Sequence, residues 1–286
     1  MIALSTTSDV LAAMQHAHLV TFTAYVMRPG PVLSALERAA SHGTRVVVRL
    51  EGQPYGDTSG DLLRGNDDAI AALRASGVDA SLSDPVKEHP LHLKAAVIDE
   101  RVAFLDDRNW PDDGLDTIVR DDNASDVRSA LEAIAGKPRN DAPLATQKDP
   151  ALRREARTIY HAADAHGSID VESESFGYGR ISAALIAAAD QHSPVRLIVA
   201  QRDLGARSRS VLQKLSGHGI SIRICANDEK MAVAGDQAWL GSANATMGVE
   251  DQLDWGLRIF DRALVSALEA RFERNWEAAT PYAPGA

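Results

Sequence analysis

The feature that most constrains this chain is an internal repeat. Residues 33–48 read LSALERAASHGTRVVV, and residues 181–199 read ISAALIAAADQHSPVRLIV. Residues 92–109, HLKAAVIDERVAFLDDRN, similarly resemble residues 228–244, DEKMAVAGDQAWLGSAN. The first pair combines a helical pattern with a buried strand, and the second combines two short strands joined by a polar turn. A repeat of about half the chain predicts two similar units.

The expected elements follow the same order in both halves. In the first half we expect strands at 19–25, 45–50, just after 77–78, 93–99, 102–105 and 116–120, and helices at 32–41, 67–76 and 125–135. In the second half we expect strands at 167–174, 194–200, 220–224 and 253–260, a hairpin at 231–240, and helices at 181–191, 208–215 and 263–276. This order predicts an α/β fold with a mixed sheet flanked by helices in each unit. The polar segment 139–150 is the expected linker between a unit at 1–138 and a unit at 151–286.

Composition narrows the class of protein. Hydrophobic residues make up 45% and charged residues 24%, so a chain of 286 residues can bury two ordinary cores. No apolar run is long enough to span a bilayer, and the first residues do not have the form of a signal peptide. The formal net charge of -10 argues against strong non-specific binding to nucleic acid or anionic membranes. Because Cys225 is the one cysteine, an internal disulfide and a thiolate metal cluster are excluded, and we expect a cytoplasmic protein.

Chemically equipped residues meet at the first hairpin. His92 and Lys94 fall on one face of the expected strand, and Asn109 follows four residues after the returning strand. They bring a nucleophile or proton carrier, a fixed positive charge and an amide donor to one end of the hairpin. Such a cluster is what chemistry on a phosphoryl group requires.

These residues resemble the phospholipase D superfamily, whose signature is His-x-Lys, four residues, Asp, and then Gly-Ser-x-Asn after a further short strand. The first half has His92, Lys94, Asp99 and Asn109 at the spacing of that pattern. The second half has Lys230 followed by a complete Gly-Ser-x-Asn at 241–244. The similarity in element order covers nearly the whole chain.

The resemblance implies that both units form one active site across a pseudo-twofold axis, with no metal or other cofactor. One histidine attacks phosphorus to give a phosphohistidine, another protonates the leaving oxygen, and water or an alcohol completes the exchange. A neutral imidazole is a competent nucleophile near pH 7. Carried onto this sequence, His92 is the nucleophile. The phosphate ligands are then Lys94, Asn109, Lys230, Ser242 and Asn244.

Three aspartates receive separate predictions. Asp99 has the opposite parity to His92, so we expect it to turn the hairpin or bind backbone at the interface of the halves. Asp116 begins a strand where the family has a carboxylate, and we expect it to orient His92 through Nδ1. Asp254 occupies the matching position in the second half, which has no histidine to orient, so a structural role is expected there.

Both halves depart from the family pattern. The second-half histidine position holds Asp228, which either acts as a substitute proton donor or marks decay of the motif. In the first half, Asp106 and Asp107 replace Gly-Ser, and an ionised Asp107 would repel a phosphate instead of donating a hydrogen bond to it.

The remaining charged residues favour ordinary surface roles. Glu172 and Glu174 alternate on one strand face and could approach the site, but a solvated strand end is the commoner arrangement. Four basic residues lie on the expected helix at 208–215 and in the segment before it, and they are most simply solvent-exposed, although they could guide an anionic substrate. They are Arg202, Arg207, Arg209 and Lys214.

The leading hypothesis is a metal-independent phosphodiesterase or transphosphatidylase acting on a phospholipid or other small phosphodiester. Two alternatives remain open. One is a catalytically reduced module that binds a phosphorylated ligand or a protein partner, which the aspartates at 107 and 228 favour. The other is a nuclease, which the net charge disfavours. Because the repeat lies within one chain, a monomer suffices.

Overall fold

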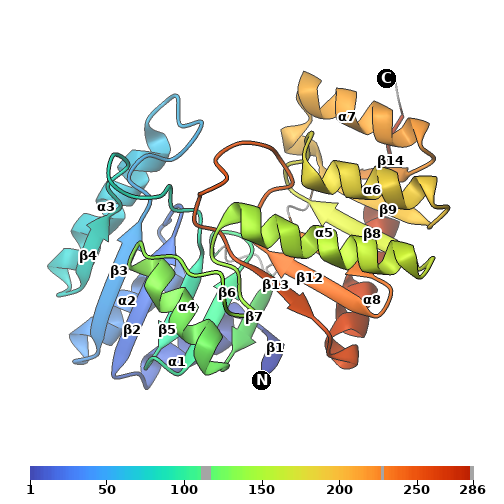
Figure 1. The fold of residues 1–286 in the computed structure, drawn as a ribbon. Helices are drawn as coiled ribbons and strands as arrows, with labels where there is room; N and C mark the ends of the chain where they lie inside the picture. Colours follow the sequence, from blue (N-terminus) through green and yellow to red (C-terminus); the bar gives the residue numbers. More distant parts are fainter. Residues whose placement is uncertain (111–116, 227–228, 284–286) are drawn as a thin grey trace. The chain divides into compact units, whose positions relative to one another are not determined.

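The computed structural model describes residues 1–110, 117–226 and 229–283, and these form two units (Figure 1). Unit 1 comprises residues 1–147 and 251–255, and unit 2 comprises residues 148–250 and 256–286. The short segment 251–255 therefore belongs to unit 1, although both of its flanks belong to unit 2. None of the described helices is long and apolar enough to cross a membrane.

Unit 1 contains a seven-stranded mixed sheet in the order β1-β7-β6-β5-β2-β3-β4. Strands β2, β3 and β4 are parallel neighbours, and every other pairing is antiparallel. The strands are β1 (Ile2–Ser5), β2 (Leu19–Ala24), β3 (Arg45–Leu50), β4 (Asp79–Leu82), β5 (Ala95–Ile98), β6 (Val102–Asp106) and β7 (Ile118–Asp121).

Unit 2 contains a second seven-stranded sheet, in the order β13-β12-β11-β8-β9-β10-β14. Its strands are β8 (Ile169–Ser173), β9 (Val195–Ala200), β10 (Ser221–Cys225), β11 (Met231–Ala234), β12 (Gln237–Gly241), β13 (Gly256–Ile259) and β14 (Thr280–Pro281). From β8 to β13 the order and directions match those of β2 to β7, so the repeat in the sequence is a repeat of topology. The added strands differ, because β1 extends the β7 edge in unit 1 and β14 extends the β10 edge in unit 2.

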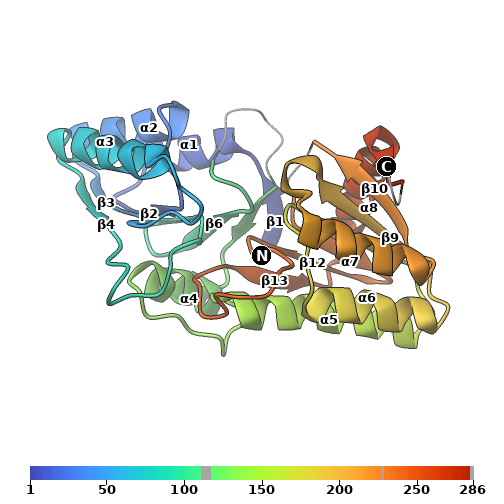
Figure 2. The ribbon, with the colours of Figure 1, turned by 90° about the horizontal axis from the view of Figure 1, so that it is seen from above.

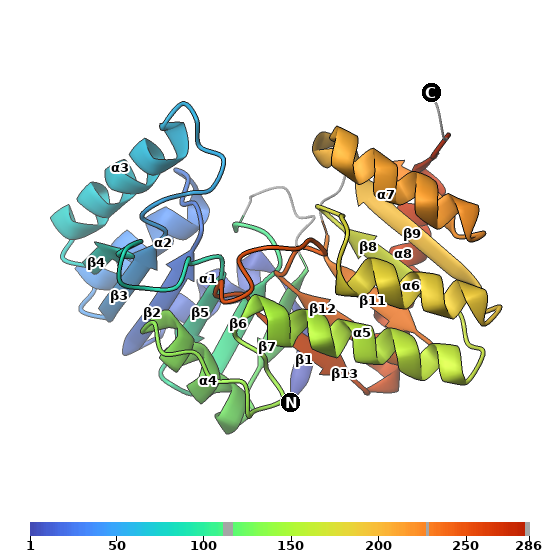
Figure 3. The same cartoon turned by 45° about the horizontal axis from the view of Figure 1, so that its top comes forward.

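Helices cover both faces of each sheet. In unit 1, α1 (Thr7–Gln15), α2 (Pro31–Ser41) and α3 (Asp61–Ala75) line one face, and α4 (Ala124–Ile134) covers the other (Figure 2). In unit 2, α5 (Lys148–Asp164), α6 (Arg180–Asp190) and α7 (Ala206–Gly217) line one face, with α8 (Arg262–Ala278) on the other (Figure 3). A 3-10 turn, η1 (Gln201–Asp203), links β9 to α7.

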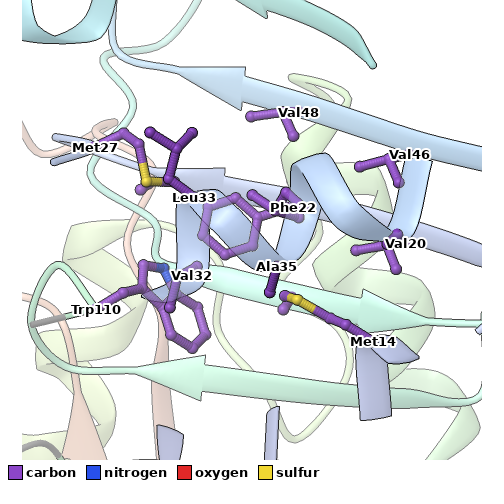
Figure 4. Packing of buried hydrophobic residues seen from close by; sticks show 14 of the residues in the cluster. Met14, Val20, Phe22, Met27, Val32, Leu33, Ala35, Val46, Val48 and Trp110 are labelled. Atoms are coloured by element: carbon purple, nitrogen blue, oxygen red, sulfur yellow. The ribbon is translucent and has the colours of Figure 1, made fainter. Parts of the chain in front are cut away.

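The core of unit 1 lies between its sheet and α1–α3. The period of two in β2 places Val20 and Phe22 on this face, where α1 and α2 cover them with residues such as Met14 (Figure 4). Burying a side chain as large as Phe22 contributes about 1.5–3 kcal/mol. The Phe22 ring also packs against Trp110, with ring centroids 5.2 Å apart. Trp110 thereby fixes the loop that follows β6 to the core.

The structure confirms the expected α/β fold with two similar mixed-sheet units. It also contains elements that the sequence did not predict: β1, α1, α5 and β14. The first turn of α1 carries a capping box, in which Thr6 and Asp9 exchange hydrogen bonds. Helix α3 begins at Asp61 instead of residue 67, and α5 begins at Lys148, inside the segment suggested as a linker.

Candidate active site

The candidate nucleophile, His92, lies in the segment that leads into β5. Its backbone N–H donates to the carbonyl of Leu253 over 2.9 Å, and the N–H of Leu253 donates to the carbonyl of Pro90 over 2.8 Å. Next to His92, the N–H of Leu91 donates to the carboxylate of Glu51, which is buried at the end of β3. The backbone of the histidine is therefore held by segment 251–255 and by β3 before any side chain is considered.

The imidazole of His92 has a different partner at each nitrogen. Nδ1 lies 2.7 Å from Oδ1 of Asp254, and Nε2 lies 2.8 Å from Nζ of Lys94. A carboxylate accepts and an ammonium donates, so Nδ1 carries the proton and the lone pair of Nε2 faces Lys94. In this tautomer the lone pair of the ring is at Nε2. About 13% of the His92 side chain is exposed, which gives the ring access to solvent, whereas Asp254 is completely buried.

Lys94 is almost fully buried, so its charge depends on nearby groups for compensation. Besides His92, its ammonium lies 5.8 Å from the ring centroid of Tyr25, within the range of a cation–π interaction. The same ring meets His92 edge-on, with centroids 5.0 Å apart, and the hydroxyl of Tyr25 donates to the carbonyl of Tyr55 over 3.2 Å. Tyr25 thus contacts both catalytic candidates and links them to the loop after β3.

The loop after β6 is fixed by its own polar side chains. Oδ1 of Asn109 accepts from the N–H of Val26 over 3.2 Å, and because that N–H is a donor, the amide nitrogen of Asn109 faces the other way. Asp106 accepts from the N–H of Trp110 over 2.6 Å, and Asp107 accepts from the N–H of Thr117 over 3.1 Å. Both carboxylates are fully buried and bind backbone.

Unit 2 reproduces this framework with different chemistry. The N–H of Gly241 donates to the carbonyl of Lys230 over 3.2 Å, as that of Asp106 does to Lys94 over 3.0 Å. Oδ1 of Asn244 accepts from the N–H of Ser175 over 3.2 Å, as Asn109 does from Val26. Lys230 is buried, but its Nζ lies 2.7 Å from Oε2 of Glu174, which occupies the position of Tyr25. The lysine of unit 2 is therefore paired with a carboxylate.

The hairpin turns also differ between the units. Asp99 and Glu100 both have a positive φ, and Oδ1 of Asp99 accepts from the N–H groups of His18 and Leu19 at 2.8 Å each. Asp99 therefore binds backbone within unit 1. The matching turn of unit 2 has Gly235, which adopts a positive φ of 61° without a side-chain anchor.

The structure brings the predicted site residues together in two groups. In unit 1, His92 and Lys94 are in contact, and Asn109 binds the segment that carries Tyr25. In unit 2, Lys230, Ser242 and Asn244 lie at the corresponding positions, and Ser242 is fully buried. Asp116 and Asp228 lie outside the described residues. Among the described residues, no group of three or more His, Cys, Asp or Glu side chains is arranged to hold a metal ion.

Three sequence-based interpretations were wrong. Asp254, expected to be structural, binds Nδ1 of His92, because segment 251–255 belongs to unit 1. Glu174 forms ion pairs and Glu172 is buried, so neither is a solvated strand end. The predicted strand at 93–99 is shorter, since β5 begins at Ala95 and leaves Lys94 before it.

Sequence reasoning also missed several supporting residues. Asn66, fully buried, donates to the carbonyls of Tyr25 and Glu51 at 2.9 Å each and accepts from the N–H of Met27. Asn66 lies just before the helix expected at 67–76, whereas α3 begins at Asp61 and includes it. Tyr25 ends the predicted strand at 19–25 and Glu51 follows the one at 45–50, which was the available signal, because side chains at strand ends often line sites.

Part of the chain is similar to a known protein family. Residues 159–276 match the family model described as "Cardiolipin synthase, PLD-like domain". No protein of curated function matches the chain. Among solved structures, polyphosphate kinase from Porphyromonas gingivalis has a TM-score of 0.74 at 17% identity and covers 99% of this chain. The chain spans about half of that protein, since the match covers 48% of it.

Two smaller structures match part of the chain. Nuc from Salmonella typhimurium, a phospholipase D family member, is 20% identical with a TM-score of 0.41 and covers 45% of this chain and 90% of its own. NucT from Helicobacter pylori is 16% identical with a TM-score of 0.43 and covers 49% and 97%. The family match over 159–276 covers less than half of the chain and lies in unit 2, and the strand order of unit 2 from β8 to β13 recurs in unit 1 from β2 to β7.

Proposed function

We propose that the chain is a phosphodiesterase or phosphatidyltransferase that forms a phosphohistidine at His92. The observation that carries the proposal is the line of contacts from Asp254 through His92 to Lys94. A carboxylate at Nδ1 holds the tautomer and stabilises the positive charge that grows on the ring during attack. An ammonium beside Nε2 is placed to compensate the charge on a phosphate oxygen.

In the first step, the lone pair of Nε2 attacks phosphorus. The Nε2–P bond forms as the bond from phosphorus to the leaving oxygen breaks, and that oxygen takes a proton. The sequence-based candidate for the acid is Asp228, which lies outside the described residues. In the second step, water or an alcohol attacks phosphorus and gives its proton to the group that protonated the leaving oxygen, the P–Nε2 bond breaks, and the histidine returns to its starting tautomer.

Lys94 has a further role in this proposal. Its ammonium occupies the direction in which Nε2 would bond to phosphorus. A bound phosphate offers the ammonium a stronger, charged acceptor than the imidazole does. Substrate binding would therefore draw Lys94 from Nε2 to a phosphate oxygen and expose the nucleophile at the moment when phosphorus is in place.

The proposed substrate is a phospholipid or another small phosphodiester. The formal net charge of -10 opposes long polyanions, and this applies to nucleic acid as well as to a polyphosphate chain. Polyphosphate and DNA are therefore comparison substrates, on which we expect little turnover.

The test is a pre-steady-state assay with bis(p-nitrophenyl) phosphate. We expect a burst of nitrophenol close to one equivalent of enzyme, and a covalent adduct on the peptide that contains His92 by mass spectrometry. The adduct should survive alkali and be lost in acid, as a phosphohistidine is. His92→Ala should abolish burst and adduct.

The matched control is His89→Ala, which removes a neighbouring histidine that pairs with Asp251. It should retain the burst. A burst that persists in folded His92→Ala would refute the proposal, as would turnover without any adduct in the wild type.

A second candidate is a module that binds a phosphorylated ligand without turning it over. The observation that favours it is the ion pair of Lys230 with Glu174 in unit 2, because a neutralised lysine contributes little to catalysis. Saturable binding of a phosphodiester without burst or adduct would support this candidate.

A further inference from the structure

One carboxylate in unit 2 bridges two cations. Oε2 of Glu174 lies 2.7 Å from Nζ of Lys230, and Oε1 pairs with Nη2 of Arg202. Two oxygens on one acidic group, each facing a different cation, form the arrangement with which a phosphate is commonly bound. The carboxylate of Glu174 thus occupies the place of an anionic ligand.

The fold places Glu174 firmly at this point. Glu174 follows directly after β8, and the N–H of the next residue, Ser175, donates to Asn244 over 3.2 Å. The hydroxyl of Ser173 donates to the carbonyl of Ser175 over 2.9 Å. The backbone on both sides of Glu174 is therefore fixed, and the carboxylate is directed by its position in the repeat.

The repeat also shows that the fold does not require a carboxylate here. The equivalent residue in unit 1 is Tyr25, whose ring lies beside Lys94 without neutralising it. A pair of charges is costly to bury and is not needed for packing, since an aromatic residue serves in the other copy. The stability of the fold therefore does not explain why unit 2 has a carboxylate at position 174.

We propose that unit 2 contains its own anion-binding site, formed by Lys230 and Arg202, which Glu174 occupies as a built-in competitor. The ligand is a phosphate group, and it displaces the carboxylate on binding. The Arg202 side chain is 56% exposed, so the incoming anion has a route from solvent, whereas the Lys230 side chain is buried. Glu174 raises the phosphate concentration at which the site fills. The proposal deepens the proposed function in taking the anion to be a phosphate, but it does not depend on turnover at His92.

The experiment measures binding of inorganic phosphate to the full chain by calorimetry at low ionic strength. Glu174→Gln keeps the size of the side chain and removes its charge. We expect it to tighten phosphate binding by about 10-fold or more, because the cations lose their competitor. Adding Lys230→Met to this variant should cancel the gain.

Glu273→Gln is the matched control, since it removes one carboxylate of unit 2 from a different arginine, Arg196. It should leave phosphate affinity unchanged. The proposal is overturned if folded Glu174→Gln binds phosphate no more tightly than the wild type, or if the gain survives Lys230→Met. Repeating the titration with His92→Ala separates the two proposals, because the gain should persist there even if His92 forms no adduct.

Discussion

The two units give their equivalent lysines opposite surroundings. Lys94 of unit 1 contacts an imidazole and the face of a tyrosine, whereas Lys230 of unit 2 is paired with Glu174. The backbone that carries each lysine is nevertheless the same, down to the hydrogen bond from the residue that ends the hairpin. The comparison teaches that a repeated fold preserves the geometry of a site, while one residue beside it decides what the site can do.

The largest expected effect concerns the carboxylate that gives unit 1 its oriented histidine. Asp254→Asn should lower turnover of bis(p-nitrophenyl) phosphate by about 10²- to 10⁴-fold, because an amide no longer selects the Nδ1–H tautomer. Stopped-flow kinetics measures the loss. The paired change Asp251→Asn, in the same segment, should have little effect. Equal losses in both variants would show that the segment matters only for folding.

The free energy of unfolding is expected to depend on pH over a different range for a buried carboxyl group in each unit. Burial raises the pKa of Glu155 in α5 of unit 2 to about 8, from an ordinary value near 4.5. The folded state then keeps its proton while the unfolded state loses it, so the free energy of unfolding should fall by about 1.4 kcal/mol per pH unit between pH 5 and 8. Glu155→Gln should remove this slope in urea unfolding measured across that range.

Unit 1 contains a carboxyl group whose pKa is also raised, and it affects stability over a lower pH range. Burial raises the pKa of Asp121 to about 6, and the neighbouring Asp126 contributes. Stability linked to Asp121 is therefore lost as the pH rises from about 4 towards 6, and Asp121→Asn should flatten the curve only there. If the free energy of unfolding changes between pH 6 and 8 and this change disappears in Asp121→Asn, the assignment of the two pH ranges to the two units is wrong.

The lysines provide a direct kinetic comparison. Lys94→Met keeps the apolar stem and removes the charge, and we expect turnover to fall by about 10²- to 10³-fold, as for the loss of a group that stabilises transition-state charge. Lys230→Met should cost less than about 10-fold, since its charge is already offset by Glu174. Losses of similar size in both variants would break the comparison.

The two asparagines are expected to behave alike. Asn109→Ala and Asn244→Ala each leave a backbone N–H without its acceptor, and each should cost about 1–3 kcal/mol of stability. Urea unfolding at one pH measures both. A cost confined to one unit would show that the shared hydrogen bond is not equally important in the two copies.

The smallest expected effect concerns the residue that replaces Glu174 in unit 1. Tyr25→Phe keeps the ring beside Lys94 and removes only the hydrogen bond to Tyr55. We expect turnover to change by about 5-fold or less, because a single neutral hydrogen bond contributes about 1 kcal/mol. A loss as large as that of Lys94→Met would assign the hydroxyl itself a chemical role.

The sequence predicted the fold well where periodicity is strong. The strand run at 45–50 and the repeated hairpins carry clear patterns, and the structure has strands there. It did not predict β14, which has two residues, or the start of α3, where glycine and aspartate residues favour a loop. Short elements depend on tertiary contacts more than on local preference, so their signal in the sequence is weak.

The sequence predicted only those site residues that lie close together along the chain. His92 and Lys94 are two residues apart and could be recognised together. Asp254 is 162 residues from His92, and nothing local indicates that its segment belongs to unit 1. The pairing of Lys230 with Glu174 likewise requires knowing which strands are neighbours.

Segment 251–255 has a consequence for dissecting this protein. Because these residues belong to unit 1 while being encoded inside unit 2, no single cut separates the units with their parts intact. A fragment ending at residue 147 would keep the imidazole but lose both its carboxylate and the strand-like bridge from Leu91 to Leu253. A truncated chain would thus keep the histidine without the carboxylate that orients it. Truncation therefore cannot separate the two halves intact, even though each has a complete sheet.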